Sequence, residues 1–179
     1  MISRDNPLDP IWNTYLTTRD CLKITDRARQ RNDISLLRRT QFVGMEEDEA
    51  LAMMRSCYDK LNDFVIIALW AVFERFIIDY IQKKGECLSS VQPAFLAEPL
   101  VEKFEFSVER LWLADILDWL KDHVCDGNLV GDAKKIKKFR DYIAHENPKK
   151  KPEDRVGPET VYNKLSVIIK KIQQETKTP

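Results

Sequence analysis

Residues 63–81, with the sequence DFVIIALWAVFERFIIDYI, decide the fold of this 179-residue chain. The segment is apolar on nearly every face of a helix, and it lies inside a longer stretch, residues 46–84, that keeps helical periodicity throughout. In a soluble protein such a helix is surrounded by other helices or by a partner subunit. Acidic residues begin the stretch and Lys83, Lys84 and Gly85 end it, as is typical of helix termini. We therefore predict one long central helix.

The segments on either side of this helix also predict α-structure. The chain has only five glycines, and strand-like alternation of apolar and polar residues is almost absent. Asp9, as an N-cap residue, and Pro10, at the first helical position, predict a helix over residues 9–32. A short polar and aliphatic connection then reaches Gly44.

The sequence after the central helix predicts a connection and a strongly amphipathic helix. Residues 86–106 contain two prolines and are expected to be irregular, with a short helix. Ser107 is expected to cap a helix over residues 108–124. Trp112 and Trp119 lie within or beside its apolar stripe, so we expect them to pack in the core and not to form a base-stacking platform. Its core positions are Leu111, Ile116, Leu117 and Leu120.

Two further helices complete the predicted fold. A turn at residues 126–128 precedes a helix over residues 132–146, which stops before Pro148. The last helix begins at Gly157 and Pro158. Its expected core residues are Val161, Leu165, Ile168 and Ile172. The prediction is an all-α, up-and-down helical bundle of about five to six helices around one long central helix. It forms a single domain over residues 1–179, with helix 9–32 as an appendage to a core at about residues 46–175.

Composition and charge exclude several classes of site. The 29 Lys and Arg residues balance 29 Asp and Glu residues, so any electrostatic recognition must come from local clustering. Such a cluster exists at residues 134–151, where seven lysines and one arginine stand against two acidic residues. The four cysteines, Cys21, Cys57, Cys87 and Cys125, are scattered singly. Their spacing indicates neither a zinc site nor a disulfide framework, and no metal or cofactor is expected.

The sequence also predicts where the protein works. The N-terminal segment lacks the apolar region of a signal peptide, and the longest apolar run, residues 64–73, is far shorter than the roughly 20 residues of a membrane span. Scattered cysteines are typical of a reducing compartment. We therefore expect a soluble, cytoplasmic protein without a membrane partner.

The segment FRDYIAH, residues 139–145, combines residue types suited to chemistry. His145 is one of only two histidines, and imidazole alone titrates near neutral pH when unperturbed, at about 6.5. At about 100° per residue, Ile136 and Ile143 lie on the buried face of the helix and His145 points the opposite way. Arg140 lies on the flank of the apolar stripe, about 140° around the helix and roughly 7.5 Å along its axis from His145.

Arg140 and His145 therefore do not meet within one straight helix. They would share a site if the helix end unwinds at His145, or if two copies of the helix face each other across a two-fold axis. The second arrangement predicts a homodimer with a composite active site. Asp141 is placed either to orient the imidazole or to hold the guanidinium.

These side chains suit phosphoryl transfer without a metal ion. In RNA, the 2′-hydroxyl attacks the adjacent phosphate when a base removes its proton, a donor stabilises the phosphorane and an acid protonates the leaving oxygen. A histidine can act as base or acid, and the planar fork of arginine fits phosphate oxygens. Nearby lysines would hold the RNA backbone without reading its sequence, although a solvated lysine-rich face is the other explanation. These are Lys134, Lys137, Lys138, Lys149, Lys150 and Lys151.

The string FRDYIAH resembles the signature of the HEPN superfamily, small all-α domains found in many RNA-cleaving toxins and defence proteins of prokaryotes. In that signature an arginine, often followed by a polar residue, precedes a histidine by a few residues, as Arg140, Asp141 and His145 do here. The upstream segment ALWAVFERFIIDYI, with Glu74, is similar to the long helix in which many members carry an aromatic and an acidic residue. The likeness covers roughly residues 46–175.

The resemblance implies a metal-independent endoribonuclease that acts as a homodimer, as a toxin or an antiphage-defence effector. Arg140 would stabilise phosphate charge, His145 would act as acid or base, and Asp141 would support both. Glu74 is a further candidate catalytic residue, for which a structural ion pair is the alternative role. The implied partners are RNA, a second copy of the chain, and an antitoxin or regulatory protein.

Two other interpretations stay open. A HEPN-like module that dimerises or binds nucleotides without cutting RNA would need only the apolar central helix. A helical bundle that binds RNA without chemistry would keep the lysines and be indifferent to His145.

Overall fold

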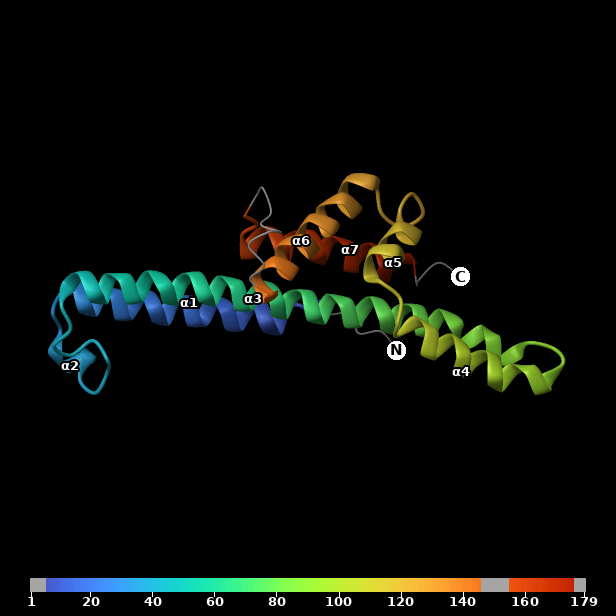
Figure 1. Cartoon of the computed structure of the whole chain (residues 1–179), viewed down its shortest axis with the longest axis horizontal. Coiled ribbons are helices and arrows are strands. Elements are labelled where there is room, and N and C mark those ends of the chain that lie inside the picture. Colours follow the sequence, from blue (N-terminus) through green and yellow to red (C-terminus); the bar gives the residue numbers. More distant parts are fainter. Residues whose placement is uncertain (1–5, 146–154, 176–179) are drawn as a thin grey trace.

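A computed structural model describes residues 6–145 and 155–175, and over these ranges the protein is all-α. The described residues form seven α-helices and two short 3-10 helices, with one isolated β-bridge and no strand. This confirms the predicted all-α helical bundle. One long helix, α3, runs through the molecule, and α1, α4, α6 and α7 pack against it (Figure 1).

Helix α3, Glu47–Gly85, is the predicted central helix and has 39 residues. At about 1.5 Å per residue it is roughly 58 Å long. Its first turn is acidic and its last turn holds Lys83 and Lys84, both favourable for the helix dipole. The middle of the helix lies in the core, where Trp70 and Phe73 are fully buried. One side stays open, because Phe64 is 64% exposed.

Helix α1, Asp9–Gln30, lies beside the N-terminal part of α3, and the short helix α2, Ile34–Leu37, sits at the end of this pair (Figure 1). The expectation that Asp9 is the N-cap is wrong. Leu8 occupies that position without a side-chain cap, and the Asp9 carboxylate instead accepts a hydrogen bond of 2.7 Å from the Tyr162 hydroxyl. The beginning of α1 also enters the core, where Leu8 is fully buried and Tyr15 nearly so.

Residues 86–106 are more helical than the sequence indicated. They form η1, Glu86–Ser90, then η2, Ala94–Leu96, and most of α4, Ala97–Val108. Pro99 did not prevent helix α4, because it lies in the first turn, where a missing N–H leaves no hydrogen bond unmade.

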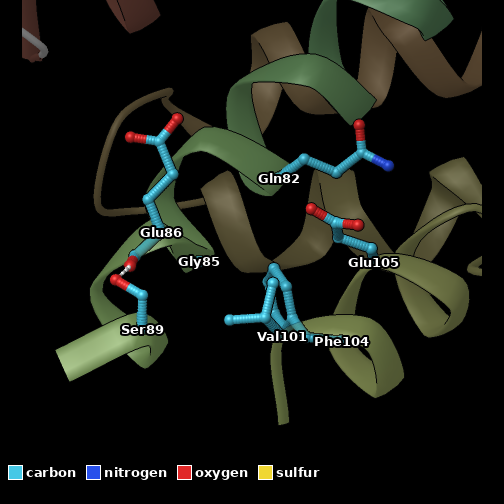
Figure 2. A pocket seen from close by; sticks show the side chains of 7 residues that line it. All are labelled: Gln82, Gly85, Glu86, Ser89, Val101, Phe104 and Glu105. Carbon is cyan, nitrogen blue, oxygen red and sulfur yellow. Dashed lines mark hydrogen bonds between the residues drawn. The ribbon is translucent and has the colours of Figure 1, made fainter. Parts of the chain in front are cut away.

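Helix α4 folds back along the end of α3 and packs closely against it (Figure 1). Gly85 permits this approach, since a Cβ there would overlap the ring of Phe104. A pocket of about 140 Å³ opens beside this contact (Figure 2). Its lining residues are Gln82, Gly85, Glu86, Ser89, Val101, Phe104 and Glu105.

The expected helix over residues 108–124 is wrong at both ends. Ser107 lies inside α4 and donates its hydroxyl to the Lys103 carbonyl at 2.6 Å, so it caps nothing. The chain then turns, and α5 covers only Leu113–Leu120. Three of the four predicted core residues are buried, namely Ile116, Leu117 and Leu120, and Leu111 packs against them partly buried.

The expectation that Trp112 and Trp119 pack in the core is wrong. Trp112 is 73% exposed and Trp119 is 55% exposed. The inner face of α5 is already filled by its leucines and Ile116, so Trp119 lies on the outer side of the helix, and Trp112 is the exposed N-cap residue just before it.

Helices α6, Gly127–His145, and α7, Pro158–Glu175, lie with α5 over the middle of α3 (Figure 1). Helix α6 begins five residues earlier than predicted. Asp126 was expected in a turn, but its carboxylate accepts the Leu129 N–H at 2.9 Å, as an N-cap does. The start of α7 and its four predicted core residues are confirmed, because Val161, Leu165, Ile168 and Ile172 are fully buried.

Candidate functional site

The segment FRDYIAH forms the last two turns of α6. Phe139 is buried, Ile143 packs partly buried against the core, and His145 is exposed. The helical wheel therefore gave the correct inner and outer faces. Hydrophobic burial of the inner face fixes the rotation of α6, and this rotation turns Arg140 towards α3.

The Arg140 side chain reaches a carboxylate on α3, 66 positions earlier in the chain. Its Nη2 donates to Glu74 Oε2 at 3.1 Å and its Nη1 donates to Asp141 Oδ1 at 3.0 Å. The guanidinium carbon lies 5.8 Å from the centroid of the Trp70 ring. The structure thus brings three predicted site residues, Glu74, Arg140 and Asp141, into one cluster at the junction of α3 and α6.

The Arg140 guanidinium is held in place, but some of its N–H groups have no acceptor among the described residues. Its Nε is buried and has no hydrogen-bond partner among the described residues. Each terminal nitrogen carries two N–H groups and donates to one carboxylate, so one N–H on each is left for another acceptor. The side chain is 24% exposed, so these groups lie close to the surface.

Asp141 takes one of the two roles expected for it. Its Oδ1 accepts from Arg140 and its Oδ2 accepts from Lys137 Nζ at 2.7 Å, so it holds the guanidinium. Among the described residues it makes no hydrogen bond with His145, and the role of orienting the imidazole is not observed. The i, i+4 spacing of Lys137 and Asp141 is a helical pairing signal that the sequence analysis did not use.

His145 stands apart from this cluster. It is exposed, and no hydrogen bond or ion pair joins its side chain to another described residue. Helix α6 is helical as far as His145, so the arrangement in which the helix unwinds there to bring His145 to Arg140 is wrong. One chain alone does not bring the two residues together.

The lysines chosen as RNA contacts have different environments. Lys134 Nζ lies 2.6 Å from both carboxylate oxygens of Asp118, and Lys137 is paired with Asp141. Lys138 is exposed and has no ion pair with a described residue. The remaining candidates, Lys149, Lys150 and Lys151, lie outside the described residues.

Comparisons with known proteins do not identify the chain. No protein-family model, curated protein or solved structure matches it. The HEPN resemblance therefore depends on the motif residues themselves. Over residues 6–145 and 155–175, no three His, Cys, Asp or Glu side chains are grouped as a metal site would require, and no helix has the length and hydrophobicity of a membrane span.

The cluster has a limited chemistry of its own. Two carboxylates, from Glu74 and Asp141, balance the cations of Arg140 and Lys137, so the site presents no excess positive charge. A phosphate would be met by the two remaining N–H groups of Arg140. An acid or base must come from elsewhere, and His145 is the exposed histidine nearest in the sequence.

Proposed function

We propose that this protein is a metal-independent endoribonuclease of the HEPN type, which acts as a homodimer and serves as a toxin or antiphage-defence effector. One observation carries the proposal. The Arg140 guanidinium is fixed between Glu74, Asp141 and the Trp70 ring with two N–H groups free, while His145 on the same helix is exposed and unengaged by the described residues. The guanidinium that would donate hydrogen bonds to a phosphate is held rigidly, and the imidazole that would transfer a proton is accessible.

Cleavage would proceed by attack of the RNA 2′-hydroxyl on the adjacent phosphorus. One histidine removes the hydroxyl proton, and a second histidine protonates the departing 5′-oxygen, which leaves a 2′,3′-cyclic phosphate. Arg140 stabilises the negative charge that develops on the phosphate oxygens. Glu74 and Asp141 act as positioning residues, since they hold the guanidinium plane.

The homodimer is part of the proposal because one chain supplies only one suitable histidine. A second copy would bring its own His145 and Arg140 to the same site. Support comes from α3, where Phe64 is 64% exposed and Ala71 is also exposed, seven residues further along the same side of the helix. This apolar strip lies on the helix that carries Glu74, so a second copy that covered it would be close to the cluster.

A non-catalytic interaction module is the second candidate function. The observation that favours it is the balance of charge in the cluster, since each carboxylate of Glu74 and Asp141 is already paired with a cation. An ion-pair network that only ties α6 to α3 would look the same. It would leave His145 without a role.

The test is to incubate the purified protein with mixed RNA in the presence of a chelator and to analyse the fragment ends. Variants Arg140→Ala and His145→Ala are compared with two matched controls. His123→Ala removes the other exposed histidine, and Arg155→Ala removes another ion-paired surface arginine. The oligomeric state of every variant is measured by light scattering.

The proposal expects cleavage by a dimer, fragments with 2′,3′-cyclic phosphate, and a loss of at least about a hundredfold in both site variants. The two controls should cleave like the wild-type protein. Unchanged cleavage by His145→Ala would show that the site is wrong. A clean wild-type dimer that cuts none of the RNAs would favour the interaction module.

A further inference from the structure

The outer face of α5 carries two large aromatic side chains that nothing in the described chain covers. Trp112 is 73% exposed and Trp119 is 55% exposed, although indole is usually among the more buried side chains. Exposed scattered leucines are ordinary on a protein surface, whereas two exposed tryptophans, one the N-cap of α5 and one within it, are not.

Asp115 lies between the two tryptophans. Asp115 and Trp119 are four positions apart in α5, so they share one side of the helix, about 6 Å apart along its axis. Trp112 is the N-cap residue immediately before the helix. Asp115 is exposed, and its carboxylate has no hydrogen bond or ion pair with another described residue.

The charge of this face indicates the kind of ligand. Asp115 is the carboxylate on the side of Trp119 and has no cation among the described residues, whereas Asp118 is paired with Lys134. The exposed Lys121, at the end of α5, extends its side chain towards Gly127. The faces of tryptophan rings attract cations, most strongly among the aromatic side chains. A single-stranded RNA would stack on the rings but would bring its phosphates against the free carboxylate of Asp115, which disfavours RNA as the ligand.

A cation–π contact within the chain lies close to α5. The guanidinium of Arg110 lies 3.8 Å from the centroid of the Phe106 ring, just before α5 begins. In that contact an arginine covers an exposed aromatic ring from within the chain. Trp112 and Trp119 have no such cation among the described residues.

We propose that the outer face of α5 is a docking site for a positively charged segment of a partner protein. Arginine or lysine side chains of the partner lie over the indole rings, and one of them pairs with Asp115. This site is distinct from the candidate nuclease site at His145, because Asp118 of α5 pairs with Lys134 of α6 and His145 lies eleven residues, or about 16.5 Å of helix, further along α6. The proposal therefore stands whether or not the protein cleaves RNA.

Binding of labelled peptides to the full-length protein tests the proposal. The probes are a twelve-residue peptide of alternating arginine and alanine, its counterpart of alternating glutamate and alanine, and a twelve-nucleotide polyuridine RNA, each followed by fluorescence polarisation. The variants are Asp115→Asn and the double variant Trp112→Ala, Trp119→Ala. Two control variants remove similar groups elsewhere. Phe95→Ala removes an aromatic side chain on η2 that is 75% exposed, and Asp48→Asn removes an exposed carboxylate at the start of α3.

The arginine peptide should bind at least tenfold more tightly than the glutamate peptide. Asp115→Asn and the double tryptophan variant should each weaken this binding about fivefold or more, and the two controls should not. Rising salt should weaken the wild-type interaction more than that of Asp115→Asn. Circular dichroism verifies that each variant is folded.

Three results would overturn the proposal. Equal binding of the arginine and glutamate peptides would show that charge plays no part. Weaker binding of polyuridine to the double tryptophan variant would assign the face to RNA. A change from dimer to monomer in that variant would show that a second copy of the chain covers the face.

Discussion

Removal of the ion pair between Glu74 and Arg140 tests the geometry on which the candidate site depends. The two charged groups are 3.1 Å apart, and the side chains are 24% exposed for Arg140 and 34% exposed for Glu74. Fully exposed pairs contribute about 0.2–1 kcal/mol, and breaking a buried pair costs about 3–5 kcal/mol. For this half-buried pair we expect a coupling free energy of about 1–1.5 kcal/mol.

A double-mutant cycle measures this coupling. Glu74→Gln and Arg140→Met are made singly and together, and the free energy of unfolding is obtained from urea titrations followed by far-ultraviolet circular dichroism. Methionine keeps an apolar stem beside Trp70 while the charge is lost. Arg140→Met should be the more destabilising single change, because it also leaves Asp141 without one of its donors. We expect it to lower the free energy of unfolding by about 2 kcal/mol.

The chain offers a matched control in the pair of Arg155 and Asp59. These groups are 3.3 Å apart, but both side chains are about 60% exposed, so the same cycle should give a coupling below about 0.5 kcal/mol. Equal coupling energies for the two pairs would refute the argument from burial. A value near zero for Glu74 and Arg140 would show that α3 and α6 are not joined as described.

Three further predictions concern stability. Gly85→Ala should destabilise the protein by about 1–3 kcal/mol in thermal unfolding, because the added Cβ overlaps the Phe104 ring; Gly131→Ala, where a Cβ would meet nothing within 4 Å, should not destabilise it. Trp70→Ala should lower the free energy of unfolding by about 3–5 kcal/mol in urea titrations, whereas Trp112→Ala and Trp119→Ala should change it by less than about 0.5 kcal/mol. A large loss of stability in the latter two variants would contradict their exposure. The backbone hydrogen bond from Leu129 lowers the pKa of Asp126, so its carboxylate stabilises α6 above the unfolded pKa of about 3.9 and this contribution is lost as the pH falls through the lowered pKa. Asp126→Ala should accordingly lower the melting temperature at pH 7 but make little difference near pH 2, and an equal effect at both would argue against the cap.

The sequence predicted the elements whose boundaries have strong local signals. Helix α3 was predicted to within one residue at each end, because its apolar run is long and its ends are oppositely charged. The start of α7 followed from Gly157 and Pro158. The boundaries of α5 and α6 could not be predicted, since apolar periodicity continues through the turn before Leu113 and residues 126–128 have the composition of a turn. In the folded chain Asp126 caps a helix that contains Gly127.

The candidate site was predicted in part for a similar reason. A helical wheel places Arg140 on a flank, but it does not say which helix lies opposite, so the contact with Glu74 followed only from the packing of α6 on α3. The exposure of Trp119 depends on the width of the inner face of α5, which periodicity alone does not define. His145 was placed correctly because burial of Phe139 determines the opposite face.

Helix α3 is continuous, so a tilt at one point would move its distant end. From Glu74 to Glu47 the helix extends 27 residues, or about 40 Å, without a break. A tilt of about 5° where α6 is joined to Glu74 would therefore move the far end, with α2, by about 3.5 Å. If a rearrangement at the ion-pair cluster tilted α3 in this way, a molecule in contact with the far end would be displaced with it.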